Sequence, residues 1–121
     1  MNVLIDSNIL IYASEPTGGQ VRNFIRTNTI FVSAISQVEV LGYHKLGGIE
    51  RQLLESFFAL ATIIPITQPI VGEAIRLRCI RKMSLGDSLV AATALLHNLT
   101  LATHNTSDFS WINGIMLFDP V

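Results

Sequence analysis

The sequence holds a single cysteine, Cys79, so no disulfide can form within the chain. Long apolar runs are missing as well, because Asp6 interrupts the first one and the run over residues 85–102 carries an acid, a histidine and an asparagine. Neither run reaches the ~20 apolar residues that a membrane-spanning helix needs. With no signal peptide at the N-terminus, these absences predict a soluble protein of the reducing cytoplasm, with no membrane contact.

Charge is also scarce, at 14% of the residues, and the formal net charge is only −1. That balance excludes binding of a polyanion by bulk attraction, so any contact with nucleic acid needs a local basic patch. Half of the residues are hydrophobic. This surplus predicts an apolar surface reserved for a partner protein or for a second copy of the chain.

Short β-branched runs alternate with helical patterns along the 121 residues. Strands are expected over residues 2–5, 29–32, 62–64, 100–102 and 115–118. Helices are expected over residues 7–13, 21–27, 33–46, 53–61, 67–83 and 87–98. The alternation predicts one α/β domain over residues 1–121, a three-layer α/β/α sandwich around a mainly parallel central sheet of four to five strands.

The informative residues are four acids in apolar surroundings, Asp6, Glu39, Asp87 and Asp108. Each lies beside a predicted strand end or helix start. In a parallel sheet the carboxyl ends of the strands share one edge, where open α/β sheets bind their ligands. The pattern therefore predicts that the four side chains converge at that edge.

Helix capping is the alternative for each acid taken alone. Asp6 suits an N-cap position, and Ser36-x-x-Glu39 and Ser84-x-x-Asp87 both match the capping-box pattern. Asn105 or Asp108 suits the cap of a short turn. Four such acids in one small domain favour convergence over four separate caps.

Convergence has a large electrostatic cost. Two ionised carboxylates ~5 Å apart repel by roughly 3 kcal/mol at an effective dielectric near 20. A pocket of several acids persists only if a cation fills it or some acids keep their protons. Oxygen ligands without histidine or cysteine suit Mg²⁺ or Mn²⁺, and such ions activate water against phosphodiesters. The acids therefore predict a metal-dependent nuclease.

With these motifs in place, the chain resembles the PIN-domain ribonuclease family, and within it the small VapC-like toxins. The motifs are Leu4-Ile5-Asp6-Ser7-Asn8, Ser36-x-x-Glu39-Val40-Leu41, Gly86-Asp87-Ser88-Leu89-Val90-Ala91-Ala92-Thr93-Ala94 and Thr103-His104-Asn105-x-x-Asp108-Phe109. Their order and spacing cover nearly the whole chain.

The resemblance implies a Mg²⁺- or Mn²⁺-dependent endoribonuclease whose catalytic and metal-binding acids are Asp6, Glu39, Asp87 and Asp108. It implies that the carboxylates and waters are held by Ser7, Asn8, Thr103 and Asn105. Asn105 stands where some relatives carry an acid, which leaves the number of metal ligands open. In toxin relatives a cognate antitoxin blocks the site, and the proteins often form homodimers.

Two further sets of residues each allow two interpretations. Arg78, Arg81 and Lys82 share one helix face, which either grips RNA phosphates or is simply solvated. Phe109 and Trp111 either stack on bases or anchor a loop to the core.

The apolar stripe Leu53, Phe57 and Phe58 is most simply core, or else part of a dimer or antitoxin surface.

Other classes fit the residues less well. An aspartyl phosphatase of the haloacid-dehalogenase type needs a second aspartate where this chain has Asn8. A phospho-receiver domain needs paired acids after the first strand and a lysine after a late one, and this chain has neither. A non-catalytic RNA-binding or protein-interaction module with the same fold is the remaining alternative.

Overall fold

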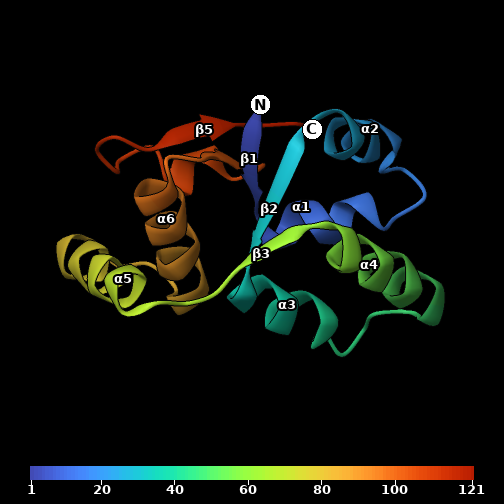
Figure 1. Ribbon diagram of the computed structural model, residues 1–121, viewed down its shortest axis with the longest axis horizontal. Helices are drawn as coiled ribbons and strands as arrows, with labels where there is room; N and C mark the ends of the chain where they lie inside the picture. Colours follow the sequence, from blue (N-terminus) through green and yellow to red (C-terminus); the bar gives the residue numbers. More distant parts are fainter.

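Five parallel strands form one sheet at the centre of the computed structural model, which describes all residues, 1–121 (Figure 1). Their order in the sheet is β3-β2-β1-β4-β5, with β1 in the middle. The strands are β1 (Asn2–Ile5), β2 (Thr29–Ser33), β3 (Thr62–Ile64), β4 (Thr100–Ala102) and β5 (Met116–Phe118). Every neighbouring pair is parallel, which confirms the predicted sheet.

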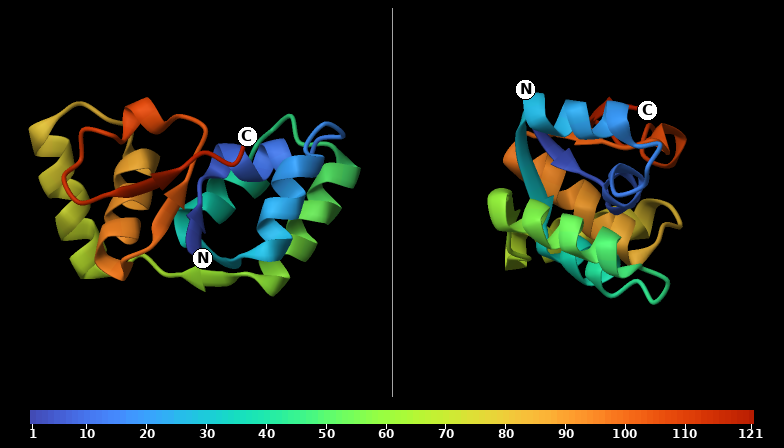
Figure 2. Two further views of the ribbon diagram at one scale, coloured as in Figure 1. Left: turned by 90° about the horizontal axis from the view of Figure 1, so that it is seen from above. Right: turned by 90° about the vertical axis from the view of Figure 1, so that its right-hand side faces the viewer.

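Helices cover both faces of the sheet, because β1 is apolar on both of its faces. Leu4 packs into one core with α5 (Gln68–Ile80) and α6 (Leu85–His97). Val3 and Ile5 point the other way, into a second core with α1 (Ser7–Ala13), α2 (Gly19–Thr27) and α4 (Gly48–Leu60). The views in Figure 2 show the same separation of the helices. The three-layer α/β/α prediction is confirmed.

Helix α3 (Ala34–Leu41) is shorter than the predicted helix over 33–46. The backbone N–H of Gly42 closes the helix on the Val38 carbonyl, and a methyl group at Gly42 would overlap that oxygen. Gly42 therefore ends the helix before the Gly47-Gly48 pair that the sequence suggested. Helix α4 then begins at Gly48, ahead of the predicted start at residue 53.

The α5–α6 boundary also differs from the prediction. Helix α5 ends at Ile80 instead of residue 83, and α6 begins at Leu85 instead of residue 87. Ser84 explains the second shift, because its side chain accepts a hydrogen bond from the Asp87 N–H at 3.1 Å and so caps the helix two residues earlier.

The strand order reverses beside β1. The chain moves outward from β1 to β3 and then returns to add β4 on the other side of β1. Ligands of open α/β sheets bind at the carboxyl ends of the strands where the order reverses in this way. Asp6 follows β1 and Thr103 follows β4, so both lie at this reversal.

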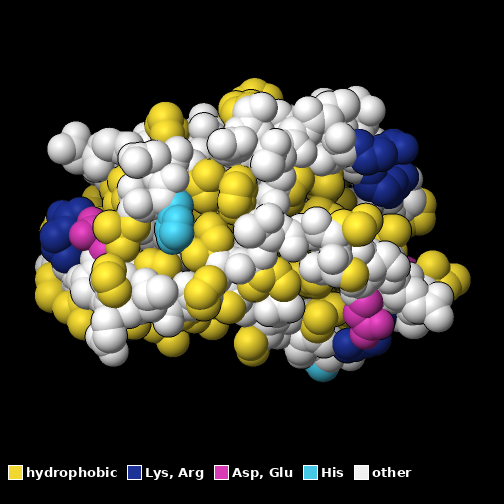
Figure 3. Space-filling view, in the orientation of Figure 1, with side chains coloured by type: hydrophobic (Ala, Val, Ile, Leu, Met, Phe, Trp, Pro, Cys, Tyr) yellow, Lys and Arg dark blue, Asp and Glu magenta, His cyan; other side chains and the backbone are white.

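Surface charge is sparse and unevenly spread. On the face shown in Figure 3, hydrophobic side chains appear across much of the surface, and the charged ones gather in a few clusters near the two ends of the molecule. No helix combines the length and the apolarity that crossing a bilayer requires.

Candidate functional site

Asp6 lies at the junction of β1 and α1, and both of its carboxylate oxygens are engaged. Oδ1 accepts a hydrogen bond from the Asn8 N–H at 3.4 Å, which caps α1, and Oδ2 accepts one from Thr103 Oγ1 at 2.8 Å. Thr103 Oγ1 in turn accepts from the Asn105 N–H at 3.1 Å. Burial is the main cause that raises the pKa of Asp6 above its ordinary value. The carboxylate is thus both a helix cap and a fixed, desolvated group at the sheet edge.

Glu39 is exposed on α3, and its carboxylate lies against α1 and α6. Ser7 Oγ donates to Glu39 Oε1 at 2.7 Å. The other oxygen, Oε2, lies so close to Gly86 that a methyl group there would overlap it. With glycine at position 86, Glu39 can lie against the first turn of α6, and a side chain there would displace the Glu39 carboxylate from its present position.

The capping box that the alternative interpretation placed at Ser36 does not form. Ser33 caps α3 instead, because its side chain accepts from the Ile35 N–H at 3.2 Å. Ser36 Oγ is buried and has no hydrogen-bond partner. Glu39 is consequently not engaged as the acid of a capping box, and its only side-chain hydrogen bond comes from Ser7.

Asp87 lies in the first turn of α6, half-buried, and Asp108 ends the short 3₁₀ turn η1 (Thr106–Asp108). Burial raises the pKa of Asp87, and the negative charges of Asp6, Asp108 and Glu39 raise it further. The charge of Asp108 also raises the pKa of Asp6. The four acids therefore lie near enough at one edge for their charges to interact.

The four acids lie near one another, but their carboxylates do not converge on a single metal position. In the structure no three acidic, histidine or cysteine side chains are close enough to hold a metal ion as they stand. The donors at this edge are carboxylate and hydroxyl oxygens, the type that Mg²⁺ and Mn²⁺ prefer. Glu39 and Asp108 are the exposed members of the set.

A polar cleft of about 550 Å³ lies against two of these acids. Its lining comprises Arg78, Arg81, Lys82, Met83, Ser84, Asp87, Asp108 and Trp111. The basic residues from the end of α5 thus line the same hollow as Asp87 and Asp108. The sequence did not indicate that Met83 and Ser84 belong to it. Phe109 is buried in the core, as one of its two interpretations predicted.

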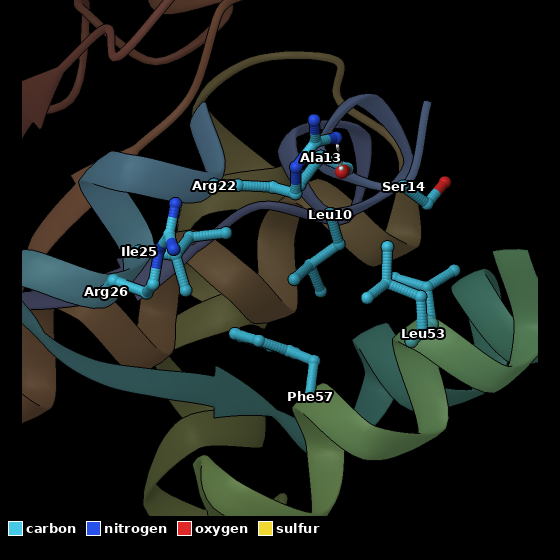
Figure 4. Close-up of a pocket in the computed structure, with 9 residues that line it drawn as sticks. Leu10, Ala13, Ser14, Arg22, Ile25, Arg26, Leu53 and Phe57 are labelled. Atoms are coloured by element: carbon cyan, nitrogen blue, oxygen red, sulfur yellow. Dashed lines mark hydrogen bonds between the residues drawn. The ribbon is translucent and has the colours of Figure 1, made fainter. Parts of the chain in front are cut away.

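A second hollow, of about 310 Å³, is apolar and lies between α1, α2 and α4 (Figure 4). Leu10, Ile25, Leu53 and Phe57 point into it, and Arg22 and Arg26 stand at its edge. We call it the apolar groove. Of the apolar stripe on α4, Phe58 is buried core as predicted, whereas Leu53 is 44% exposed and lines this groove.

Comparison with known proteins places the fold. The family model of the PIN domain matches residues 3–113. A toxin–antitoxin complex from Klebsiella pneumoniae resembles the chain at 31% identity, with a TM-score of 0.77 over 98% of each chain. No curated protein is similar enough in sequence to count as a match.

Two further solved structures share the fold at lower identity. VapBC2 from Rickettsia felis, bound to a DNA fragment from the promoter, has 24% identity and a TM-score of 0.83 over 98% of each chain. DNA-bound VapBC from Salmonella typhimurium has 18% identity and a TM-score of 0.87, covering 100% of this chain and 99% of the other.

Proposed function

The chain belongs to the PIN domain family, and from this premise we propose that it is a metal-dependent endoribonuclease and the toxin of a toxin–antitoxin pair. The observation that carries the proposal is the gathering of Asp6, Glu39, Asp87 and Asp108 at the carboxyl edge of the sheet. Burial raises the pKa of Asp87, and the charges of the other three acids raise it further, so ionising the whole set without a cation is electrostatically unfavourable. A divalent ion removes that cost.

We assign the role of each acid from how firmly the structure holds its side chain. Asp6 and Asp87 are the firmest ligands, since Asp6 is fixed by Thr103 and Asp87 lies on the capped first turn of α6. Glu39, oriented by Ser7, is placed to ligate or to orient the attacking water. Asp108 sits on an exposed turn and suits a second, weaker ion.

Supporting contacts keep the carboxylates in place. Thr103 and Ser7 each donate a hydrogen bond to an acid, and the backbone N–H groups of Asn8 and Asn105 complete the set. Such outer contacts orient ligands and tune their basicity. A bound Mg²⁺ or Mn²⁺ would supply an activated water and neutralise the charge that develops on the phosphodiester.

Cleavage of a mixed-sequence RNA tests the proposal. Wild type is expected to cleave with Mg²⁺ or Mn²⁺ and not in EDTA, and Asp6→Asn to lose about 100-fold or more of the rate. Glu73→Gln is the matched control, since Glu73 lies on α5 beside Arg76 and away from the acidic edge. Equal cleavage by wild type and Asp6→Asn, or no cleavage with any metal, would contradict the proposal and favour a non-catalytic module with this fold.

The proposed antitoxin would occupy the apolar groove. Leu10, Ile25, Leu53 and Phe57 offer the kind of surface that takes the apolar face of an amphipathic helix. Arg26 is exposed at the edge and forms no salt bridge, so a partner with an acidic flank complements it. The similarity to the Klebsiella pneumoniae toxin–antitoxin complex supports this partner class.

A homodimer is also proposed. Large apolar side chains remain exposed outside the groove, and several lie on the α5–α6 layer, namely Ile75, Ile80, Leu85 and Leu96. Burying them against a second copy removes apolar surface from water. Light scattering at micromolar concentration is expected to give twice the chain mass, and a monomer would contradict the proposal.

The proposed location of the protein is the reducing cytoplasm, and the exposed free thiol of Cys79 is compatible with that compartment.

A further inference from the structure

The cations of the polar cleft have no acidic side chain paired with them. Arg78, Arg81 and Lys82 form no salt bridge, although Asp87 and Asp108 line the same hollow. Arg76, two residues before Arg78 on the same helix, is by contrast paired with Glu73. Charged groups left without partners beside a cleft are available to an anionic ligand.

Trp111 is fixed in the same cleft by two contacts. Its indole Nε1–H donates to the Asp108 carbonyl at 2.9 Å. The Arg81 guanidinium carbon lies 5.6 Å from the centroid of its ring. The first contact ties the ring to the turn that carries an acid, and the second places a flexible, exposed side chain over the ring.

The two aromatic residues that follow Asp108 have separate roles. Phe109 is 1% exposed and belongs to the core around Leu4 and α6. Trp111 rests partly on that core and lines the cleft with the remainder of its surface. Only Trp111 can therefore present an aromatic face to a ligand.

Resting on the proposed ribonuclease function, we propose that Trp111 is a stacking platform for one unpaired RNA base and that Arg78, Arg81 and Lys82 bind the flanking phosphates. A base that stacks on the ring displaces the Arg81 guanidinium, which then meets the adjacent phosphate. The Arg78 Nε–H is already engaged with the Met83 carbonyl at 3.2 Å, so its guanidinium is oriented at the cleft before the ligand arrives.

This arrangement selects single-stranded RNA. A base can stack on a side chain only if it is free of its own neighbours, as in single strands, loops and bulges. Because Trp111 is hydrogen-bonded to the turn of Asp108, a base held there sets the position of its phosphates relative to that acid and Asp87. The platform thus determines which phosphodiester reaches the acidic edge.

The test is RNA binding in EDTA, where no cleavage intervenes. Trp111 is the only tryptophan in the chain, so its fluorescence reports on this position alone. A mixed-sequence single-stranded RNA of about 12 nucleotides, enough to fill a site of this class, is expected to quench it, and the matched duplex to bind more weakly. Because the Trp111 variants lack tryptophan, their binding is followed by the anisotropy of an end-labelled RNA. Trp111→Leu is expected to weaken single-strand binding about 5- to 100-fold, and Trp111→Phe to restore part of the loss. Arg81→Gln is expected to lower the slope of log affinity against log salt by about 0.7.

Two control variants match these changes. Arg76→Gln removes the same charge from the same helix, and Tyr43→Leu removes an exposed aromatic ring outside the cleft. Both are expected to bind as wild type does. Melting temperatures identify any variant that is damaged in folding, and the Trp111→Phe and Arg81→Gln pair carries the test if Trp111→Leu is unstable.

The inference is overturned if saturating RNA leaves the fluorescence unchanged, if the RNA does not bind, if duplex binds as tightly as single strand, or if stable Trp111→Leu binds like wild type. Cleavage assays separate this outcome from a failure of the proposed function. Wild-type cleavage that persists unchanged in Trp111→Leu overturns the platform alone. Quenching by RNA without cleavage in any metal supports the platform and contradicts the nuclease.

Discussion

The polar cleft and the apolar groove are two hollows of this fold, and each is energetically unfavourable in the isolated chain for a different reason. The cleft is lined by Asp87 and Asp108, and burial together with the negative charges of the neighbouring acids raises the pKa of Asp87. The groove leaves apolar side chains such as Leu53 in water, at about 25 cal/mol for each Å² of apolar surface. A bound cation would relieve the charge repulsion in the cleft, and a partner protein would cover the apolar surface of the groove.

Helix α1 connects the acidic edge to the groove. Asp6 caps its first turn, and Leu10 and Ala13 from its later turns line the groove. Seven residues of helix span about 10 Å. A partner in the groove therefore lies close to the acids while the chemistry of each region depends on different side chains. Variants in one region should leave the other region's activity intact.

The largest effect is expected for the acidic edge. Asp87→Asn removes a proposed ligand while keeping the size of the side chain, so metal-dependent RNA cleavage should fall about 100-fold or more. Binding of the proposed antitoxin should stay as in wild type, as measured by co-purification and calorimetry. If Asp87→Asn lost the partner as well, the two regions would not be separable.

Phe57→Asp changes the groove and leaves the acidic edge as it is. It places a charge among Leu10, Ile25 and Leu53, and hot-spot residues of this kind contribute about 2 kcal/mol or more to binding. Partner affinity should therefore fall about 30-fold or more, with RNA cleavage by the free protein unchanged. Glu55→Gln, on the same helix and paired only with Arg51, is the control. Tight binding by Phe57→Asp would move the partner to another surface.

A smaller change is expected at Gly86. A methyl group there overlaps Glu39 Oε2, the end of a flexible side chain, so Gly86→Ala should turn Glu39 away from Ser7 without unfolding the protein. Alanine favours the helix over glycine by about 1 kcal/mol, so the melting temperature should hold or rise. Cleavage should fall about 10-fold, within the range for a lost orienting contact. Full activity would show that Glu39 need not stay against α6.

Much of the fold was predictable because the local signals are strong. β1 is apolar on both faces and is followed by Asp6, which predicts a central parallel strand with a polar end. The helix ends were harder to predict. Gly42 looked no different in sequence from a glycine inside a helix, and its contact with the Val38 carbonyl decides where α3 stops.

The site was predictable only in part. Acids after strands indicate a shared edge, and the charges of Asp6, Asp108 and Glu39 do act on Asp87 in the structure, but the sequence cannot show which partner holds each one. Thr103 lies 97 residues from Asp6, and Ser7 lies 32 residues from Glu39, so these pairings depend on the sheet order. The cleft lining by Ser84 and Trp111 and the groove formed by three helices likewise arise from tertiary packing that no local pattern encodes.

The smallest expected effect is a pH-dependent shift in stability at the acidic edge. The folded pKa values of Asp6 and Asp87 lie above their ordinary value of 3.8, so the folded chain holds protons more tightly than the unfolded chain there. Their contribution to stability is thus largest at low pH and is lost as pH rises through the folded pKa values. Asp87→Asn removes one of these groups and the repulsion that it exerts on Asp6.

In EDTA at pH 7, Asp87→Asn should therefore melt at or a few degrees above the wild-type temperature, since about 1 kcal/mol shifts a domain of this size by roughly 4 °C. The difference should shrink as pH falls toward 4, and added Mg²⁺ should raise the melting temperature of wild type more than that of the variant. Groove variants should show neither trend. A variant that melts several degrees lower at every pH would instead make Asp87 a stabilising residue of the first turn of α6, where negative charge favours the helix. Ser84 already provides the hydrogen bond that caps this turn, so the repulsion among the acids should prevail.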